Sequence, residues 1–357
     1  MSIESKEEII YGRYKNMGNT CYMGSILHIL QQMPIFVEYF YTAKFNKIIQ
    51  NKSKEEIDDY ISYHIYRLFN YSLNNNNITI TPETFRKCIG KKCDIWLENS
   101  HQDSQEFLNF VIYNIEEELG IKMKMLPGRI KLDDNYDSIN KGFLTMMANL
   151  TFNMYQVKEY SPIKEMFGGM LLSKTKCEYC SDTRNMFDPI NMLQLSIPDN
   201  KNNHTLEECL DFFLKQERLD KEEAINCHFC GFKSRAYKNY LIWKTPKILV
   251  IQFKRFEKNR NKKIGDNIVY PLYDLDLEKY IHDDSPYKNT SKYNLVGINF
   301  HDDFNMGRID FGHYTSLVKS NNNNWYYYND SNQPVKIKKG ETIQNRKAYL
   351  LFYYRDN

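Results

Sequence analysis

The sequence predicts an α+β fold with its functional cleft between a helical half and a sheet-forming half. Stretches of helical periodicity fall in the first 120 residues, whereas the chain beyond about residue 240 carries short runs of β-branched and aromatic residues separated by turn residues. Helices that precede strands, instead of alternating with them, favour an antiparallel sheet with the helices segregated from it. Binding sites commonly form where two such halves meet.

The first predicted helix opens at Cys21. Apolar residues recur at helical spacing through CYMGSILHIL, Thr20 is a suitable capping residue, and Pro34 lies just beyond the last apolar position. A thiol at the first position of a helix faces the positive end of the helix dipole. The question is whether Cys21 is only a small buried residue or a nucleophile that needs a base elsewhere in the chain.

A second helix is predicted from about Ser100 to Gly120, because the stretch SHQDSQEFLNFVIYNIEEEL carries a continuous apolar stripe. Asp103 and Glu106 lie three residues apart in its first turn. Acidic side chains at that place commonly satisfy free backbone N–H groups, and Ser100-x-x-Asp103 is itself a capping pattern. The residues alone therefore favour capping as the role of these two carboxylates.

Strands are predicted in LIWKTPKILVIQFKRF, YNLVGINF, HYTSLVK, WYYYND and AYLLFYYR. The asparagine runs at 74–77 and 321–324 indicate loop tips. A basic cluster is interpreted as a solvated hairpin tip without a function of its own. It consists of Lys254, Arg255, Lys258, Arg260, Lys262 and Lys263.

Composition excludes several classes of protein. The chain is 42% hydrophobic and 26% charged, as in ordinary globular proteins, and its formal net charge of +3 is too small to indicate nucleic acid or an anionic membrane as the main partner. The acidic start MSIESKEEIIYGR is unlike a signal peptide, and no apolar run is long enough to span a membrane. We expect a monomer in the cytosol or nucleus, with no organic cofactor.

The eight cysteines include two Cys-x-x-Cys pairs, Cys177 with Cys180 and Cys227 with Cys230. In a reducing compartment such pairs are metal ligands more often than disulfides, and two of them complete a tetrahedral zinc site. The spacing between the pairs predicts that they lie at the tips of two long hairpins. Two redox pairs are the alternative. We expect a structural zinc ion, because four cysteines leave no coordination position open for catalysis.

His313 is the best candidate for the base that Cys21 requires. It follows Phe311-Gly312 and begins the predicted strand HYTSLVK, and a glycine there allows backbone or substrate to come close. The next strand leads to Asn329 and Asp330, whose side chains can accept an N–H bond from an imidazole and fix its orientation. Nucleophile, base and orienting residue thus occur in this order along the chain.

Together these motifs resemble the ubiquitin-specific proteases, a family of papain-like cysteine peptidases built from a thumb, a palm and fingers. The resemblance covers roughly residues 10 to 355. NMGNTCYM looks like the family's cysteine box, HQDSQEFL like its glutamine-aspartate-glutamate box and KILVIQFKRF like a palm strand. GHYTSLV with WYYYNDSNQPV looks like its histidine box, AYLLFYYR like its final strand, and the two Cys-x-x-Cys pairs like its finger zinc.

The resemblance implies a helical thumb at about 10–125, and zinc-tipped β fingers at about 165–245 inserted in an antiparallel β palm at about 126–355. It implies that Cys21 is the nucleophile, His313 the general base, Asn329 the residue that orients His313 and Asn16 the oxyanion-hole donor. Asp330 corresponds to an acidic residue that assists or substitutes for Asn329, so the resemblance leaves the division of labour between them open.

The resemblance also implies substrate-binding residues. Asp103 and Glu106 would bind the arginine-rich tail of ubiquitin, while Gly312 and Tyr314 would border the channel for its terminal glycines. The implied activity is hydrolysis of the isopeptide or peptide bond after that terminus, on ubiquitin and ubiquitinated proteins. A catalytically weak ubiquitin-binding module and a protease for another ubiquitin-like modifier are the alternatives.

Overall fold

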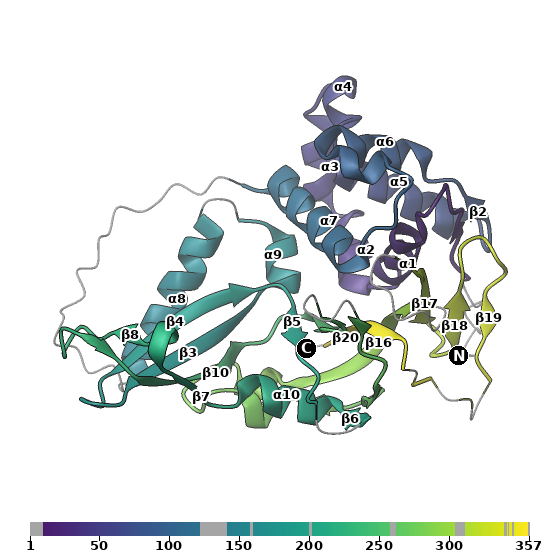
Figure 1. Ribbon diagram of the computed structural model, residues 1–357. Helices are drawn as coiled ribbons and strands as arrows, with labels where there is room; N and C mark the ends of the chain where they lie inside the picture. Colours follow the sequence, from purple (N-terminus) through teal and green to yellow (C-terminus); the bar gives the residue numbers. More distant parts are fainter. Residues whose placement is uncertain are drawn as a thin grey trace, which may run out of the picture.

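Helices occupy the first third of the chain and strands dominate the remainder, which confirms the predicted α+β class. The computed structural model describes residues 10–121, 141–157, 160–199, 202–257, 262–303, 311–338, 341, 343–344 and 346–355. Figure 1 shows the helical region at one end of the molecule, a sheet beneath it, and a second sheet that extends to the opposite end. Among the described residues, no helix combines the length and apolar character needed to cross a bilayer.

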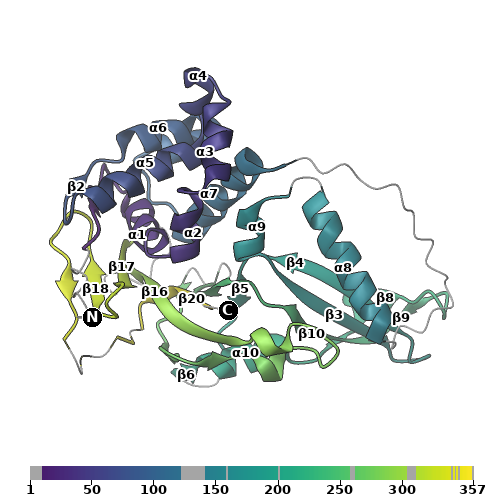
Figure 2. The ribbon, with the colours of Figure 1, turned by 180° about the vertical axis from the view of Figure 1, so that it is seen from behind.

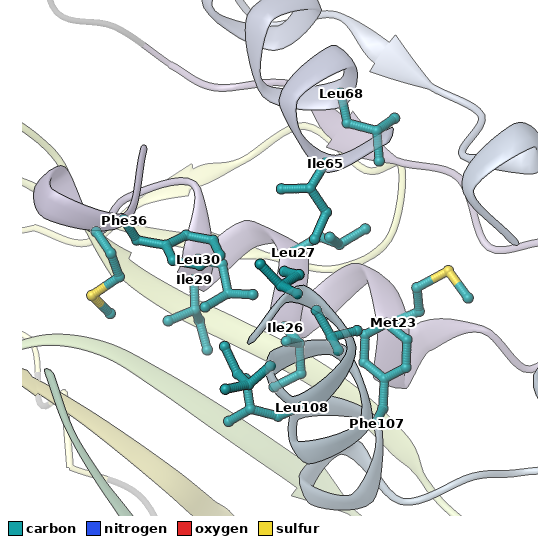
Figure 3. Packing of buried hydrophobic residues seen from close by; sticks show 14 of the residues in the cluster. Met23, Ile26, Leu27, Ile29, Leu30, Phe36, Ile65, Leu68, Phe107 and Leu108 are labelled. Atoms are coloured by element: carbon teal, nitrogen blue, oxygen red, sulfur yellow. The ribbon is translucent and has the colours of Figure 1, made fainter. Parts of the chain in front are cut away.

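The helical region, or thumb, surrounds one central helix. Every residue of α1 is buried, as expected for a helix with neighbours on all sides. Figure 3 shows Met23, Ile26 and Leu27 of this helix packed among side chains from the surrounding elements. The thumb helices are α1 (Cys21–Leu30), α2 (Pro34–Tyr39), α3 (Ala43–Gln50), α4 (Lys54–Ile57), α5 (Ile61–Asn74), α6 (Glu83–Lys92) and α7 (Ser104–Leu119).

The palm is a mostly antiparallel sheet that contacts α1 through its strands β16 and β17. All of β11 is buried, with Ile248 and Val250 in the core beneath the thumb and Leu249 and Ile251 in a second core that includes α10 (Leu206–Leu214). Its strands, in spatial order, are β19 (Val335–Lys336), β18 (Trp325–Tyr328), β17 (His313–Lys319), β16 (Lys292–Asp302), β20 (Ala348–Tyr354), β11 (Ile248–Phe253) and β5 (Leu193–Leu195), and β15 (Leu275–Asp276) pairs with β16.

The fingers are a separate sheet of long strands, with α8 (Lys141–Val157) against β4, as both views of the ribbon show (Figures 1 and 2). α9 (Pro162–Phe167) connects the fingers to α7 of the thumb. The strands, in spatial order, are β4 (Thr183–Ile190), β3 (Gly169–Cys177), β10 (Ala236–Lys244) and β7 (Glu217–Leu219), and β8 (Ile225–Asn226) pairs with β9 (Lys233–Ser234).

Short strand pairs complete the fold. They are β1 (Arg13–Tyr14) with β2 (Thr79–Ile80), β6 (Asn203–Thr205) with β14 (Asn267–Val269), and β12 (Phe256–Glu257) with β13 (Lys262–Lys263). The asparagine runs lie at loop tips as predicted, although Asn74 is still the last residue of α5. Asn77 and Asn323 have positive φ angles of 55° and 61°, a conformation that asparagine adopts more readily than most residues.

Two predictions from the sequence need correction, one about the start of the second helix and one about the basic cluster. The second helix begins at Ser104 and not near Ser100, because Asp103 is its N-cap residue and accepts bonds from the first-turn N–H groups. The basic cluster is a solvated tip only in part: Lys254 is exposed, but Arg255 is fully buried and Lys263 is 7% exposed. Both are buried because backbone carbonyls accept their N–H groups, as those of Ala348 and His301 do at 2.7 and 2.6 Å. Lys258 and Arg260 lie outside the described residues.

Candidate active site

Cys21 is the first residue of α1 and is 3% exposed. The predicted start of this helix is confirmed, with Thr20 at the N-cap position. The Thr20 side chain makes no capping hydrogen bond; its hydroxyl oxygen instead accepts from the backbone N–H of Met17 at 2.8 Å. Thr20 therefore closes the preceding loop and leaves the N-terminus of the helix beside the thiol.

The loop before Cys21 is wound around the side chain of Asn16. The Asn16 Oδ1 atom accepts from the backbone N–H groups of Gly18 and Thr20 at 3.2 and 3.0 Å. Gly18 and Asn19 have φ angles of 95° and 53°, so the loop reverses direction through two left-handed residues. This winding leaves the amide nitrogen of Asn16 as its outward-facing donor, the group that an oxyanion hole requires.

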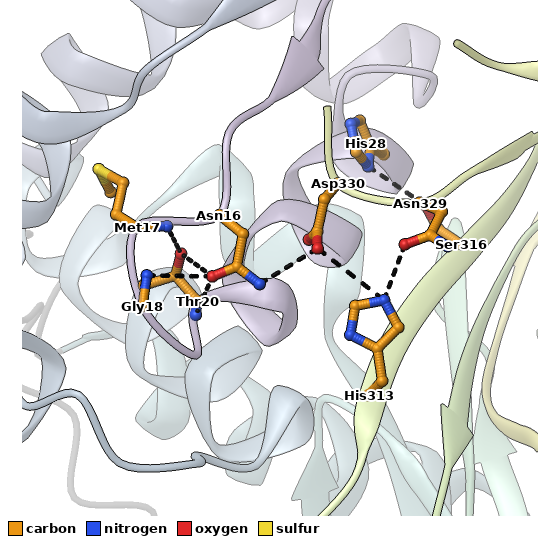
Figure 4. A network of polar contacts seen from close by, with 9 residues as sticks. All are labelled: Asn16, Met17, Gly18, Thr20, His28, His313, Ser316, Asn329 and Asp330. Carbon is orange, nitrogen blue, oxygen red and sulfur yellow. Dashed lines mark hydrogen bonds and ion pairs between the residues drawn. The ribbon is translucent and has the colours of Figure 1, made fainter. Parts of the chain in front are cut away.

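Asn16 reaches residues that are more than 300 positions away in the chain. Its Nδ2 atom donates to Oδ2 of Asp330 at 3.1 Å, which leaves the second N–H of the amide for another acceptor. Figure 4 shows Asn16, Asp330, His313 and Asn329 joined in one chain of contacts. The structure thus brings together the loop before Cys21 and the ends of β17 and β18.

His313 is the first residue of β17, and its Nε2 atom lies 2.8 Å from Oδ1 of Asn329. Because an amide oxygen accepts, Nε2 carries a proton in this contact, and Nδ1 is the ring nitrogen that can exchange a second proton with a thiol. The hydrogen bond with Cys21, followed by the bond to Asn329 and the negative charges of Cys21 and Asp330, raises the pKa of His313 to about 9 against the opposing effect of burial. This arrangement suits a thiol and imidazole that exchange one proton.

Asn329 and Asp330 have different contacts. Asn329 makes the short bond to His313, whereas Oδ2 of Asp330 lies 3.9 Å from the same Nε2 atom and accepts from Asn16. Asp330 has a φ angle of 49°, in the left-handed region. In this structure Asn329 orients the imidazole, and Asp330 connects His313 to Asn16.

The two carboxylates of the predicted second helix also differ. Asp103 caps α7, with Oδ1 accepting from the backbone N–H groups of Gln105 and Glu106 at 2.6 and 3.3 Å. Its Oδ2 accepts from the Tyr349 hydroxyl at 2.7 Å, so both oxygens already have partners. Burial raises the pKa of Asp103 above its ordinary value. Glu106 is exposed at the first turn, and its side chain is the more accessible of the two for a cationic partner.

Gly312 and Tyr314 flank His313 and pack against His301, a residue that sequence reasoning did not select. A Cβ atom on Gly312 would lie 2.2 Å from Nε2 of His301, so only glycine fits there. Tyr314 is 6% exposed, with its ring centre 4.6 Å from that of His301. Burial lowers the pKa of His301 to about 3, so this imidazole is neutral. In the sequence, Gly312 indicated only that some group comes close to this strand, and the structure shows that this group is His301.

The four cysteines of the two Cys-x-x-Cys pairs form a cluster at the far end of the fingers from α1 (Figure 1). Their sulfur atoms all lie within 4.8 Å of one another, with Cys177 to Cys230 at 3.8 Å and Cys180 to Cys227 at 3.6 Å. A tetrahedral site with metal–sulfur bonds of about 2.3 Å requires sulfur atoms about 3.8 Å apart. The cluster could therefore hold a metal ion.

Each cysteine pair is folded by its own turn. The residue after the second cysteine has a positive φ, 61° at Ser181 and 70° at Gly231, and its N–H donates to the carbonyl of the first cysteine. The first pair lies at the tip of the long hairpin β3–β4, as predicted. The second does not lie on a long hairpin, because β8 and β9 pair over only two residues each.

Comparison with known proteins shows the family. The model described as "Ubiquitin carboxyl-terminal hydrolase" matches residues 13–353. The chain is 29% identical over 356 residues to ubiquitin carboxyl-terminal hydrolase Usp2 of Drosophila melanogaster, covering 99% of this chain and 36% of that protein. It is 28% identical to ubiquitin carboxyl-terminal hydrolase 4 of Saccharomyces cerevisiae (strain YJM789), covering 96% of this chain and 39% of that protein. It is also 28% identical to ubiquitin carboxyl-terminal hydrolase 2 of Homo sapiens, covering 95% of this chain and 54% of that protein. The chain thus spans between about a third and a half of the length of these relatives.

Solved structures show the same fold. The SAGA DUB module of Ubp8, Sgf11, Sus1 and Sgf73 bound to monoubiquitin contains a chain that matches with a TM-score of 0.72 and 28% identity, covering 97% of this chain and 69% of that one. The module bound to ubiquitin aldehyde matches with a TM-score of 0.71 and 27% identity, covering 100% and 72%. These matches agree with the thumb, palm and fingers described above. The chain belongs to the ubiquitin carboxyl-terminal hydrolase family.

Proposed function

We propose that this chain is a cysteine-type deubiquitinase that hydrolyses the bond after the C-terminal glycine of ubiquitin. The observation that carries the proposal is the convergence of Cys21, His313 and Asn329 on one site: His313 is hydrogen-bonded to Cys21, and its Nε2 atom lies 2.8 Å from Oδ1 of Asn329. Family membership and similarity to structures bound to ubiquitin support the choice of substrate.

In the proposed reaction the sulfur of Cys21 attacks the carbonyl carbon of the terminal glycine, and the thiol proton is held by Nδ1 of His313. The negative charge that develops on the carbonyl oxygen is met by the free N–H of Asn16 and the backbone N–H of Cys21. His313 then protonates the leaving amine, and a thioester remains on Cys21. Water attacks that thioester with His313 as the base, which releases ubiquitin and restores the thiol.

For substrate binding we propose that Glu106, the accessible carboxylate, contacts the arginine-rich tail of ubiquitin. Asp103, whose carboxylate caps the helix, would add negative charge near that contact. Gly312 and the backbone beside Tyr314 would border the narrow path of the terminal glycines. We propose that the protein acts in a reducing compartment, the cytosol or nucleus, because the reaction needs Cys21 to remain a thiol. We propose that the catalytic unit acts as a monomer.

The metal proposed for the finger cluster is zinc, because closed tetrahedral sets of four thiolates suit zinc and contain no position for substrate. Cys177, Cys180, Cys227 and Cys230 would hold it. Zinc bound there would contribute folding free energy to the finger tip. Metal analysis of purified protein, with Cys180→Ser beside the wild type, tests this proposal: about one equivalent of zinc is expected in the wild type and much less in the variant.

The experiment that tests the function uses ubiquitin with a C-terminal electrophile. We expect the wild type to gain the mass of one ubiquitin and Cys21→Ala to gain none, whereas Cys93→Ala, which removes a half-buried thiol elsewhere in the thumb, should react like the wild type. Binding without an adduct would indicate a catalytically weak ubiquitin-binding module. Reaction only with the same electrophile on another ubiquitin-like modifier would overturn the choice of ubiquitin.

A further inference from the structure

Arg86 of α6 joins two segments that lead to the candidate active site. Its guanidinium group is half-buried, and all three nitrogen atoms donate hydrogen bonds, nearly all of them to backbone carbonyls. Nη1 donates to the carbonyl of Met17 at 3.0 Å, inside the loop that leads to Cys21. The other acceptors lie in the segment before α7: the carbonyls of Trp96, Leu97 and Glu98 and Oδ1 of Asn99, at 2.9 to 3.1 Å.

The same two segments contact each other directly. The Asn19 side chain donates to the carbonyl of Asn99 at 2.7 Å. Gly18 packs so closely on Asn99 that a Cβ atom would lie 2.9 Å from its Oδ1. The loop before Cys21 is therefore held from inside by the oxygen of Asn16 and from outside by Arg86 and Asn99.

We propose that Arg86 is a positioning residue for the proposed hydrolysis: it holds the loop from Asn16 to Cys21 in the shape that aims the Asn16 N–H at the developing oxyanion. This inference rests on the proposed function. The hydrogen bonds of Arg86 go to Met17 and to residues 96–99, so it would act on the site through the backbone of Met17. Residues 16–20 contain two left-handed residues, and such a loop keeps its shape only where its surroundings fix it.

The planar fork of arginine is what the contacts require. One guanidinium donates in several directions within a plane, so it can hold Met17 on one side and the 96–99 segment on the other. A lysine ammonium on a flexible stem can hold only part of this set. Arg86→Lys should therefore keep the charge and most of the packing while releasing one of the two segments.

The test compares two substrates that differ in the need for an oxyanion hole. Hydrolysis of a fluorogenic amide at the C-terminus of ubiquitin passes through an oxyanion intermediate. Addition of the thiol to an alkyne at the same place forms a covalent adduct without developing charge on oxygen. For Arg86→Ala we expect kcat on the amide to fall about 10²-fold with KM changed less than about threefold, and the rate of alkyne labelling to stay within about threefold of wild type. Lys87→Ala is the matched control, because Lys87 is exposed on the same helix and pairs with Glu83 instead.

Two further measurements complete the test. Arg86→Lys should slow hydrolysis of the amide about tenfold and leave the rate of alkyne labelling normal. When Arg86→Ala is added to Asn16→Ala, the rate of amide hydrolysis should fall by less than about a further threefold, because both substitutions remove the same interaction with the oxyanion. Three results would each overturn the inference. Arg86→Ala could slow both reactions equally, Arg86→Lys could hydrolyse the amide at the wild-type rate, or the effects of Arg86→Ala and Asn16→Ala on amide hydrolysis could be additive. A wild-type protein inert toward both probes would instead overturn the proposed function.

Discussion

Replacing Gly312 by alanine should disable the candidate site without touching any of its functional side chains. The added Cβ would lie 2.2 Å from Nε2 and 2.6 Å from Cε1 of His301, and 2.8 Å from the carbonyl oxygen of Asp302. The φ angle of Gly312 is not in the left-handed region, so backbone strain does not contribute and the effect comes from crowding. The consequence depends on which partner moves.

His301 has little freedom to move away. It is 3% exposed, and its ring is packed against Phe256 and Tyr314 with ring centres 5.3 and 4.6 Å apart. The Asp302 carbonyl is fixed in the pairing of β16 with β17, where Asp302 lies opposite His313. The strand itself must therefore withdraw. Reaching an ordinary separation of 3.4 Å from the present 2.2 Å means a displacement of about 1 Å at the residue before His313.

A displacement of about 1 Å at a catalytic base costs about 10²-fold in rate, and overpacking costs about 1–3 kcal/mol of stability. For Gly312→Ala we expect kcat/KM on a fluorogenic ubiquitin amide to fall about 10²-fold. Alkyne labelling should fall as well, because the thiol loses its hydrogen bond to His313. Urea unfolding of the same variant measures the stability cost separately.

Gly265→Ala provides the matched control, since a Cβ at that glycine would meet no atom of the described residues within 4 Å. It should behave like the wild type in both assays. Hydrolysis by Gly312→Ala within about threefold of wild type would refute the reasoning, because it would mean that His301 yields and His313 does not move.

The remaining predictions concern the pH profile, the carboxylates and the finger cluster. The pKa of His313 is raised to about 9, so kcat/KM should fall as the pH rises through about 9, where the imidazolium that protonates the leaving amine is lost. Asn329→Ala removes a hydrogen bond that raises the pKa of His313, so the decrease in kcat/KM should begin at lower pH. An unchanged pH profile would contradict the role of the Asn329–His313 bond in raising this pKa. Asp103→Ala should cost about 0.5–2 kcal/mol in urea unfolding through the lost helix cap, whereas Glu106→Ala should raise KM with stability unchanged. Cys180→Ser or strong chelation should lower the melting temperature while leaving the rate of the chemical step near wild type, and selective loss of that step would count against a structural metal.

Local patterns in the sequence determined the elements that carry the chemistry. The helix from Cys21 to Leu30 follows from apolar spacing alone, and Gly120 ends α7 as predicted. The spacing within the cysteine pairs predicted the finger cluster, because each pair is folded by a turn of its own neighbours. Such features depend on residues a few positions apart, so they can be recognised before the fold is known.

Only the tertiary structure decided how distant segments meet. It gave Asn329 and Asp330 different contacts, placed His301 against Gly312, buried Arg255 and Lys263, and made Arg86 the link between two loops. In each case the partner is supplied by strand pairing or loop packing many residues away. A side chain's charge says what it can bind, but its burial and its acceptors depend on neighbours that only folding brings together.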